Sequence, residues 1–227
     1  CSKTQLKRFK KLGFQLILQI DKMKDGNPVT IRRINEFTRG RTSDGNKLLY
    51  ASDGSDIKSD AWYRNQPFLD EPIKLSWRIS SKRVIEGTTN KNYLDQTGLL
   101  IEYLKKAYNN HMPEKYEEPI NLFNAKKAEI AEPLATGNWI KAGDILSSLS
   151  ITNMIRELIP SLIYRLHLTE ATTGEKLFPS IYVWTASRDS GGWFVSGGRF
   201  GADGAVVSSS RPGDGWSGVG GSLSLEL

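Results

Sequence analysis

The sequence predicts a mixed α+β protein in which an antiparallel sheet, built from strands near both ends of the chain, carries a central helical segment on one face. Apolar and polar residues alternate near both ends, residues 95–159 have the spacing of amphipathic helices, and residues 191–221 hold 11 of the 21 glycines. We therefore expect one α+β domain over residues 1–227. Its parts are a basic segment (1–50), a helical segment (95–159) and a glycine-rich β-meander (160–227).

The composition is that of a chain with a sizeable core. Apolar residues make up 38% and charged residues 25% of the 227 residues. A chain of this length can bury about 70% of the surface that it exposes when unfolded. No window approaches 18 consecutive apolar residues, so we expect no membrane-spanning helix.

The amino-terminal segment offers two interpretations. Residues 14–20 alternate with a period of two, which predicts a strand. A helix beginning at Ser2 competes with it, and Gly13 would allow a break from helix to strand. The turn at residues 25–28 precedes a second apolar run from Val29 to Ile34, which we interpret as the other strand of a hairpin.

The next segments predict a loop, a strand and helices. Residues 38–66 are polar and rich in turn residues. Four residues of the following strand (Ile73, Leu75, Trp77, Ile79) are expected to face the core, and Lys74, Ser76, Arg78 and Ser80 to face water. Helices are expected over residues 99–108, 124–132 and 144–159.

The last third is expected to return to strands. Leu162 to Thr169 alternates apolar and polar residues, which predicts a strand. Further strands are expected over residues 181–186, 193–196, 205–209 and 222–227, connected by glycine loops.

Charge is concentrated at the amino end. Residues 1–50 hold 12 lysines and arginines against 4 acidic residues, a net charge of +8, whereas the whole chain carries +6. An excess confined to one segment favours a polyanionic partner, although Lys-rich segments are often simply solvated.

Several kinds of catalytic or cofactor site are disfavoured. Residues 213–218 match G-x-G-x-x-G by letter, but the glycines that follow cannot sustain the helix that a dinucleotide site needs. One cysteine and two distant histidines exclude a structural zinc site, so we expect no metal and no cofactor. A Mg²⁺-dependent nuclease built on Asp44, Asp56 and Lys58 remains an alternative.

Cys1 leaves localisation open. The absence of a second cysteine fits a reducing, cytoplasmic compartment. The alternative is a lipid-anchored or extracellular bacterial protein, with Cys1 as a processed lipoprotein terminus.

Arginines and aromatic residues in the late glycine loops are the other candidate constellation. Arginine pairs with phosphate and exposed aromatic rings stack on bases, although Trp193 and Trp216 could equally belong to the core. The candidate nucleic-acid-binding residues are Lys7, Arg8, Lys10, Lys11, Arg32, Arg33, Arg39, Arg41, Lys74, Arg78, Arg188, Arg199, Arg211, Trp193 and Trp216.

From these features we expect a non-catalytic protein that binds RNA or DNA, alone or as a subunit of a larger nucleoprotein assembly. One alternative is a bacterial surface lipoprotein or secreted module that binds a glycan or a protein. The Mg²⁺-dependent nuclease is the second alternative.

Overall fold

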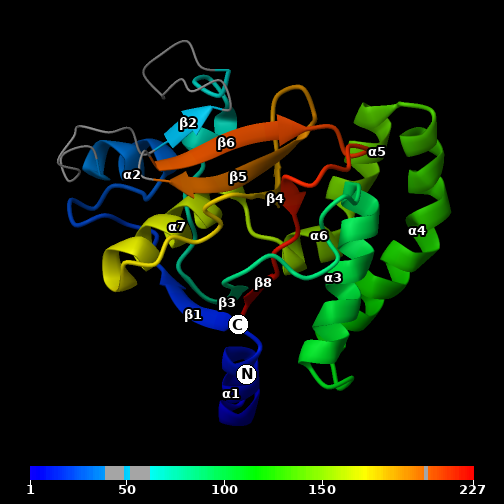
Figure 1. The fold of residues 1–227 in the computed structure, drawn as a ribbon, viewed down its shortest axis with the longest axis horizontal. Coiled ribbons are helices and arrows are strands. Elements are labelled where there is room, and N and C mark those ends of the chain that lie inside the picture. The colour runs from blue at the N-terminus through cyan, green and yellow to red at the C-terminus, as the bar shows by residue number, and fades with distance from the viewer. Residues whose placement is uncertain (39–48, 52–61, 202–203) are drawn as a thin grey trace.

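The computed structural model describes residues 1–38, 49–51, 62–201 and 204–227, and it has the mixed α+β architecture that the sequence predicts (Figure 1). The helices are α1 (Lys3–Lys11), α2 (Ile31–Thr38), α3 (Tyr93–Ala107), α4 (Glu117–Ala135), α5 (Trp139–Ser148), α6 (Ser150–Ile155) and α7 (Ile159–Thr173), with 3-10 turns at Pro67–Leu69 and Glu114–Tyr116. The strands are β1 (Phe14–Gln19), β2 (Leu49–Ala51), β3 (Ser76–Ser81), β4 (Tyr182–Arg188), β5 (Phe194–Gly201), β6 (Gly204–Ser210), β7 (Val219–Gly220) and β8 (Ser224–Glu226).

The strands form two sheets. The small sheet is antiparallel, in the order β1-β3-β8, so that strands from the two ends of the chain meet on β3. The large sheet has the order β2-β6-β5-β4-β7, and its centre is the antiparallel meander β4-β5-β6. The predicted pairing of amino-terminal with carboxy-terminal strands and the predicted meander are both confirmed.

The start of the chain combines both interpretations of the sequence. Ser2 caps α1, because its hydroxyl accepts a hydrogen bond from the Gln5 amide while the Gln5 side chain accepts one from the Ser2 amide. Gly13 then takes a φ of +81°, a left-handed conformation that ends the helix and lets β1 begin at Phe14.

The second strand predicted from Val29 to Ile34 is wrong. The chain turns at residues 25–28 as expected, but only one isolated bridge, between Lys22 and Pro28, forms before α2 begins. The Thr30 hydroxyl accepts a hydrogen bond from the Arg33 amide, and such a bond favours a helix start over an extended strand. Ile31 and Ile34 are nevertheless buried, because their spacing of three residues places them on one side of a helix as well. Val29, just before the helix, is also buried.

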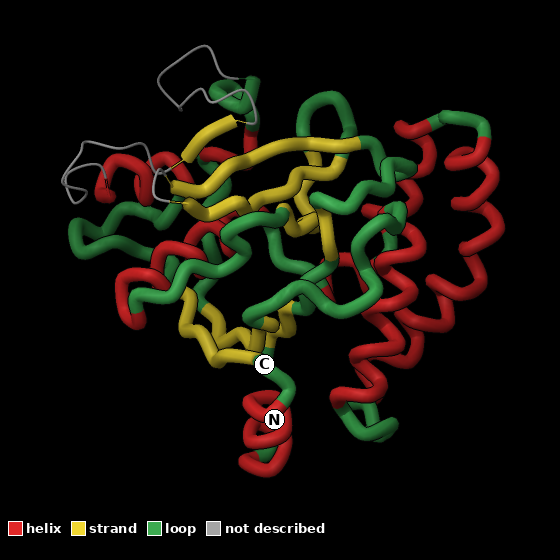
Figure 2. Tube along the Cα trace, in the orientation of Figure 1, coloured by secondary structure: helices red, strands yellow, loops and turns green. Residues whose placement is uncertain are grey.

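The predicted helical segment over 95–159 is confirmed in α3 to α6, which gather on one side of the molecule (Figure 2). Helix α4 packs on α3, α5 and α6, and α6 contacts β8 of the small sheet. This side therefore meets the small sheet where the chain ends.

The strand predicted from Leu162 to Thr169 is also wrong, because this segment is part of α7. Figure 1 shows α7 between the two sheets, and it contacts β1 on one side and β4 and β5 on the other. A helix covered on both sides buries polar as well as apolar residues, here Arg165, His167 and Thr169, so its sequence loses the one-sided pattern of an amphipathic helix. Gly197 allows the close approach of α7, since a Cβ there would lie 2.8 Å from the Ile159 side chain.

A buried ion pair joins the layers around α7. Arg165 of α7 lies against Glu157, and the two side chains are only 1% and 3% exposed. The Arg165 guanidinium also donates to the carbonyl of Ser81 in β3, and the Ala186 amide of β4 donates to the carbonyl of Glu157. The pair therefore links the small sheet to the large one.

Candidate functional site

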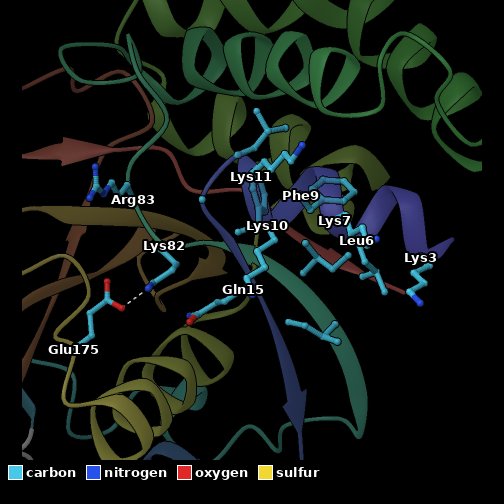
Figure 3. Close-up of a pocket in the computed structure, with 15 residues that line it drawn as sticks. Lys3, Leu6, Lys7, Phe9, Lys10, Lys11, Gln15, Lys82, Arg83 and Glu175 are labelled. Atoms are coloured by element: carbon cyan, nitrogen blue, oxygen red, sulfur yellow. Dashed lines mark ion pairs between the residues drawn. The ribbon is translucent and has the colours of Figure 1, made fainter.

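A basic groove of about 930 Å³ lies between α1, the start of β1 and the chain that leaves β3 (Figure 3). Six cations line it: Lys3, Lys7, Lys10, Lys11, Lys82 and Arg83. Its apolar lining residues are Leu6, Phe9, Leu12, Phe14, Leu16 and Ile79. We call this feature the basic groove. It combines an apolar floor with a positively charged rim.

Helix α1 is held in place by Arg8 and Phe9. The Arg8 guanidinium donates to the carbonyls of Lys106 and Ala107, at 2.8 Å each, in the last turn of α3, where a positive charge is favourable. The Phe9 ring packs edge-on against Phe14 and Tyr108, with centroids 5.1 and 5.2 Å away. Arg8 therefore fixes α1 against α3, while the lysines on the other side of α1 line the basic groove.

The other wall comes from the end of β3. The Lys82 amide donates to the Gly13 carbonyl at 3.0 Å, which brings Lys82 and Arg83 beside the junction of α1 and β1. Among the residues that the structure describes, Glu175 is the one carboxylate that lines the groove, and it forms an ion pair with Lys82 (Figure 3). Within the described part of the chain, the other five cations have no carboxylate within ion-pair distance.

The described cations of the first 50 residues do not form one surface. Arg32 makes a two-pronged ion pair with Asp70, at 2.8 and 2.9 Å, and its guanidinium lowers the pKa of the Asp70 carboxyl. Arg33 pairs with Glu36. Figure 1 shows α1 and α2 at different ends of the molecule. The predicted residues Arg39 and Arg41 lie outside the described residues.

The burial expected around strand β3 is reversed at Arg78 and Trp77, whereas Ile73 and Ile79 are buried as predicted. Arg78, expected to face water, is 8% exposed and donates to the side chain and carbonyl of Ser224 as well as to Glu226. Its burial lowers the pKa of the guanidinium. Trp77, expected in the core, is 49% exposed, and Lys74 is exposed on the chain before the strand.

Helix α7 is the physical reason for this reversal. It covers the face of the small sheet that carries Arg78 and Gln19, and the Gln19 side chain accepts a hydrogen bond from Ser161 of α7. The polar face is therefore buried with partners, and Leu16, Leu18 and Trp77 of the apolar face are left exposed. Alternation shows that a strand has two faces but does not show which face another element covers.

An apolar strip continues from the groove over this outer face of the small sheet. Its residues, 37% to 63% exposed, are Leu16, Leu18, Ile20, Leu75, Trp77 and Leu227. Leu16 lies opposite Ile79 in the groove floor, and Leu18 lies opposite Trp77 in the next pair of the same face. Contiguous exposed apolar side chains of this kind often mark a binding surface.

The late arginines and tryptophans lie elsewhere, around the large sheet. Arg188 pairs with Asp144 of α5 at 2.6 Å, and the Arg199 guanidinium stands over the Tyr182 ring at 5.1 Å. The Arg211 guanidinium stands over the Trp193 ring at 5.3 Å, and Trp216 packs on the core beside Tyr182. Of the predicted binding residues, the structure therefore brings Lys7, Lys10 and Lys11 together in the basic groove. The late arginines and tryptophans do not line that groove.

Three groove residues and one aromatic residue escaped the sequence analysis. Lys3 could have been found, because it continues the helical spacing of Lys7 and Lys10. Lys82 and Arg83 gave no signal, since only the fold brings them to α1. Trp77 was assigned to the wrong face.

Other sites suggested by the sequence find little support among the described residues. These contain no group of three or more His, Cys, Asp or Glu side chains placed to hold a metal ion, and Asp44, Asp56 and Lys58 lie outside them. His167 is buried in α7, where burial lowers its pKa to about 4. In the described ranges no helix is long and apolar enough to cross a membrane.

No protein-family model, no curated protein and no solved structure matches this chain. A functional proposal for this chain therefore rests on the geometry and charge of the basic groove.

Proposed function

We propose that this protein is a non-catalytic nucleic-acid-binding protein that holds a phosphate backbone in the basic groove, alone or as a subunit of a nucleoprotein assembly. The observation that carries the proposal is the gathering of six cations around one concave surface whose single carboxylate is already paired. Such a concentration of one charge attracts polyanions and raises their association rate.

The shape of the cationic rim favours a chain of phosphates over a single small anion. Lys3, Lys7 and Lys10 follow one another at helical spacing along α1, with Lys11 beside them. At a rise of 1.5 Å per residue, this row is roughly 12 Å long. Phosphates of one duplex strand follow each other about every 3.4 Å along the helix axis, so the row can face about three of them.

The residue types favour binding that does not depend on sequence. Five of the six cations are lysines, which act as point charges and lack the fixed two-pronged geometry with which arginine reads guanine. Gln15 is the one amide side chain that lines the groove, so few groups there could read base edges. We therefore expect contacts mainly with phosphates.

The test is the affinity for a labelled oligonucleotide, measured by fluorescence anisotropy at 0.1 M salt. The triple variant Lys3→Gln/Lys7→Gln/Lys10→Gln removes three phosphate contacts while keeping side chains with good helix propensity. Because the exponent of the salt dependence falls by about 0.7 to 0.9 for each lost contact, we expect binding to weaken by roughly 100- to 500-fold at this salt.

The matched control is Lys24→Gln/Lys91→Gln/Lys127→Gln, which removes the same charge from exposed lysines that do not line the groove. It should bind within a few-fold of the parent protein. Equal weakening in the two triple variants would show that net charge alone drives binding and would refute the proposed site.

A further inference from the structure

The basic groove and the apolar strip form one continuous surface with two chemical characters. We propose that this surface binds single-stranded nucleic acid in preference to duplex, with phosphates along the cationic rim and a base stacked on Trp77. The inference rests on the proposed function of the basic groove and assigns the class of nucleic acid that the groove takes.

The register of the small sheet places Trp77 next to the groove. Leu16 and Ile79 are paired across β1 and β3 and both line the groove, and Leu18 and Trp77 are the next pair on that face. Two residues along a strand span about 7 Å. A nucleotide with its phosphate at the groove rim can therefore extend its base over the strip.

Trp77 differs from Trp62, Trp184 and Trp193 in what surrounds its ring. Trp184 is buried, Trp62 packs on Tyr63 and Phe68, and Trp193 lies under Arg211. In the described part of the chain, the Trp77 ring makes no aromatic or cation–π contact, and the side chain is 49% exposed. A half-exposed indole on a sheet face has the geometry of a stacking platform for a base.

The combination of rim and strip favours a single strand. In a duplex, the flat faces of the bases are stacked on one another and unavailable, so a duplex could use the cations of the rim but would leave the apolar strip uncovered. A single strand offers phosphates and unstacked bases together. Grooves of positive charge with aromatic platforms are the usual solution for binding single strands without sequence preference.

The positive charge beside the apolar strip limits which other molecules could bind to this surface. A partner that is apolar alone would gain nothing from six cations, so the occupant must carry negative charge. An acidic amphipathic peptide and an anionic lipid surface also combine the two characters. Neither has planar rings that require Trp77 in particular, because an aliphatic side chain there would serve them nearly as well.

The experiment compares a labelled 12-nucleotide single strand with a duplex of the same sequence, for the full chain and three variants. Trp77→Leu keeps an apolar side chain but removes the stacking ring. It should weaken single-strand binding by roughly 5- to 150-fold, the range of one base–aromatic stack, and leave duplex binding unchanged. Trp77→Tyr should retain most of the single-strand affinity, and Trp193→Leu, the matched control, should retain all of it.

The possible outcomes separate this inference from the proposed function. If the triple lysine variant loses binding while Trp77→Leu binds the single strand like the parent, the groove binds nucleic acid and the stacking inference is overturned. If the parent binds neither oligonucleotide at 0.05 M salt, both proposals fail. Binding of anionic phosphatidylserine vesicles or of an acidic amphipathic helix, with no single-strand binding, would also overturn the inference.

Discussion

The buried pair between Arg165 and Glu157 permits a sharp prediction about stability. Both side chains are almost completely buried, and the Arg165 Nε lies 3.1 Å from each Glu157 carboxylate oxygen. Glu157→Gln keeps the shape of the side chain but leaves the Arg165 charge buried without its counter-charge. Removing one partner of a buried pair costs about 3–5 kcal/mol.

This loss is large relative to the total free energy of unfolding of the protein. A domain of this kind is stable by about 5–15 kcal/mol, so the variant would lose a substantial fraction of its stability. The Arg165 guanidinium also donates to the Ser81 carbonyl at 3.0 Å and to the Ser222 hydroxyl at 3.4 Å. These contacts tie α7 to the small sheet, so the loss should also loosen the packing between the sheets.

Urea denaturation followed by tryptophan fluorescence measures the free energy of unfolding. The double variant Arg165→Met/Glu157→Leu should be more stable than Glu157→Gln, because it leaves no unpaired charge in the core. Lys126→Ala, which breaks an exposed pair with Glu129, should cost less than about 1 kcal/mol. A loss below 1 kcal/mol in Glu157→Gln would refute the view that this pair joins the layers.

Three further perturbations test other parts of the fold. Arg8→Ala removes the hydrogen bonds that join α1 to α3, so it should lower the free energy of unfolding in urea by about 2 kcal/mol. The variant should also bind the oligonucleotide more weakly, and unchanged binding would contradict this account. Burial lowers the pKa of His167 from 6.5 to about 4, so its contribution to stability is complete above pH 6.5 and is lost between pH 6.5 and 4, by up to about 3 kcal/mol. His167→Leu should flatten the dependence of the urea midpoint on pH in that window, and an unchanged profile would exclude His167 as its source. Gly198→Ala should lower the melting temperature strongly, because φ is +146° and a Cβ would lie 2.2 Å from the Ile181 carbonyl oxygen; a normal melt would contradict the backbone geometry.

The sequence predicted the parts of the fold that local chemistry determines. Gly13 marks the change from helix to strand, and the short apolar runs around Val183 and Val195, linked by glycine loops, identify strands of the meander. The prediction from sequence failed where contacts between elements determine which side of a segment is buried. The segment of α7 is buried on both sides, and the covered face of β3 is chosen by α7 and not by the strand itself.

The candidate site likewise contains residues that the sequence predicted and residues that only the fold brings to the groove. Lys7, Lys10 and Lys11 were predicted because charge density is visible in a sequence. Lys82 reaches the groove because its backbone amide donates a hydrogen bond to the Gly13 carbonyl, a contact between residues far apart in the chain. Trp77 was predicted to be buried, because a large apolar residue on an alternating strand usually is.

The central claim is that the six cations of the basic groove contact nucleic-acid phosphates, and the salt dependence of binding tests it most directly. For a single strand, the slope of log K against log[salt] should be about −4 for the parent protein and about −2 for Lys3→Gln/Lys7→Gln/Lys10→Gln. A slope near zero in the parent, or the same slope in both proteins, would contradict the claim.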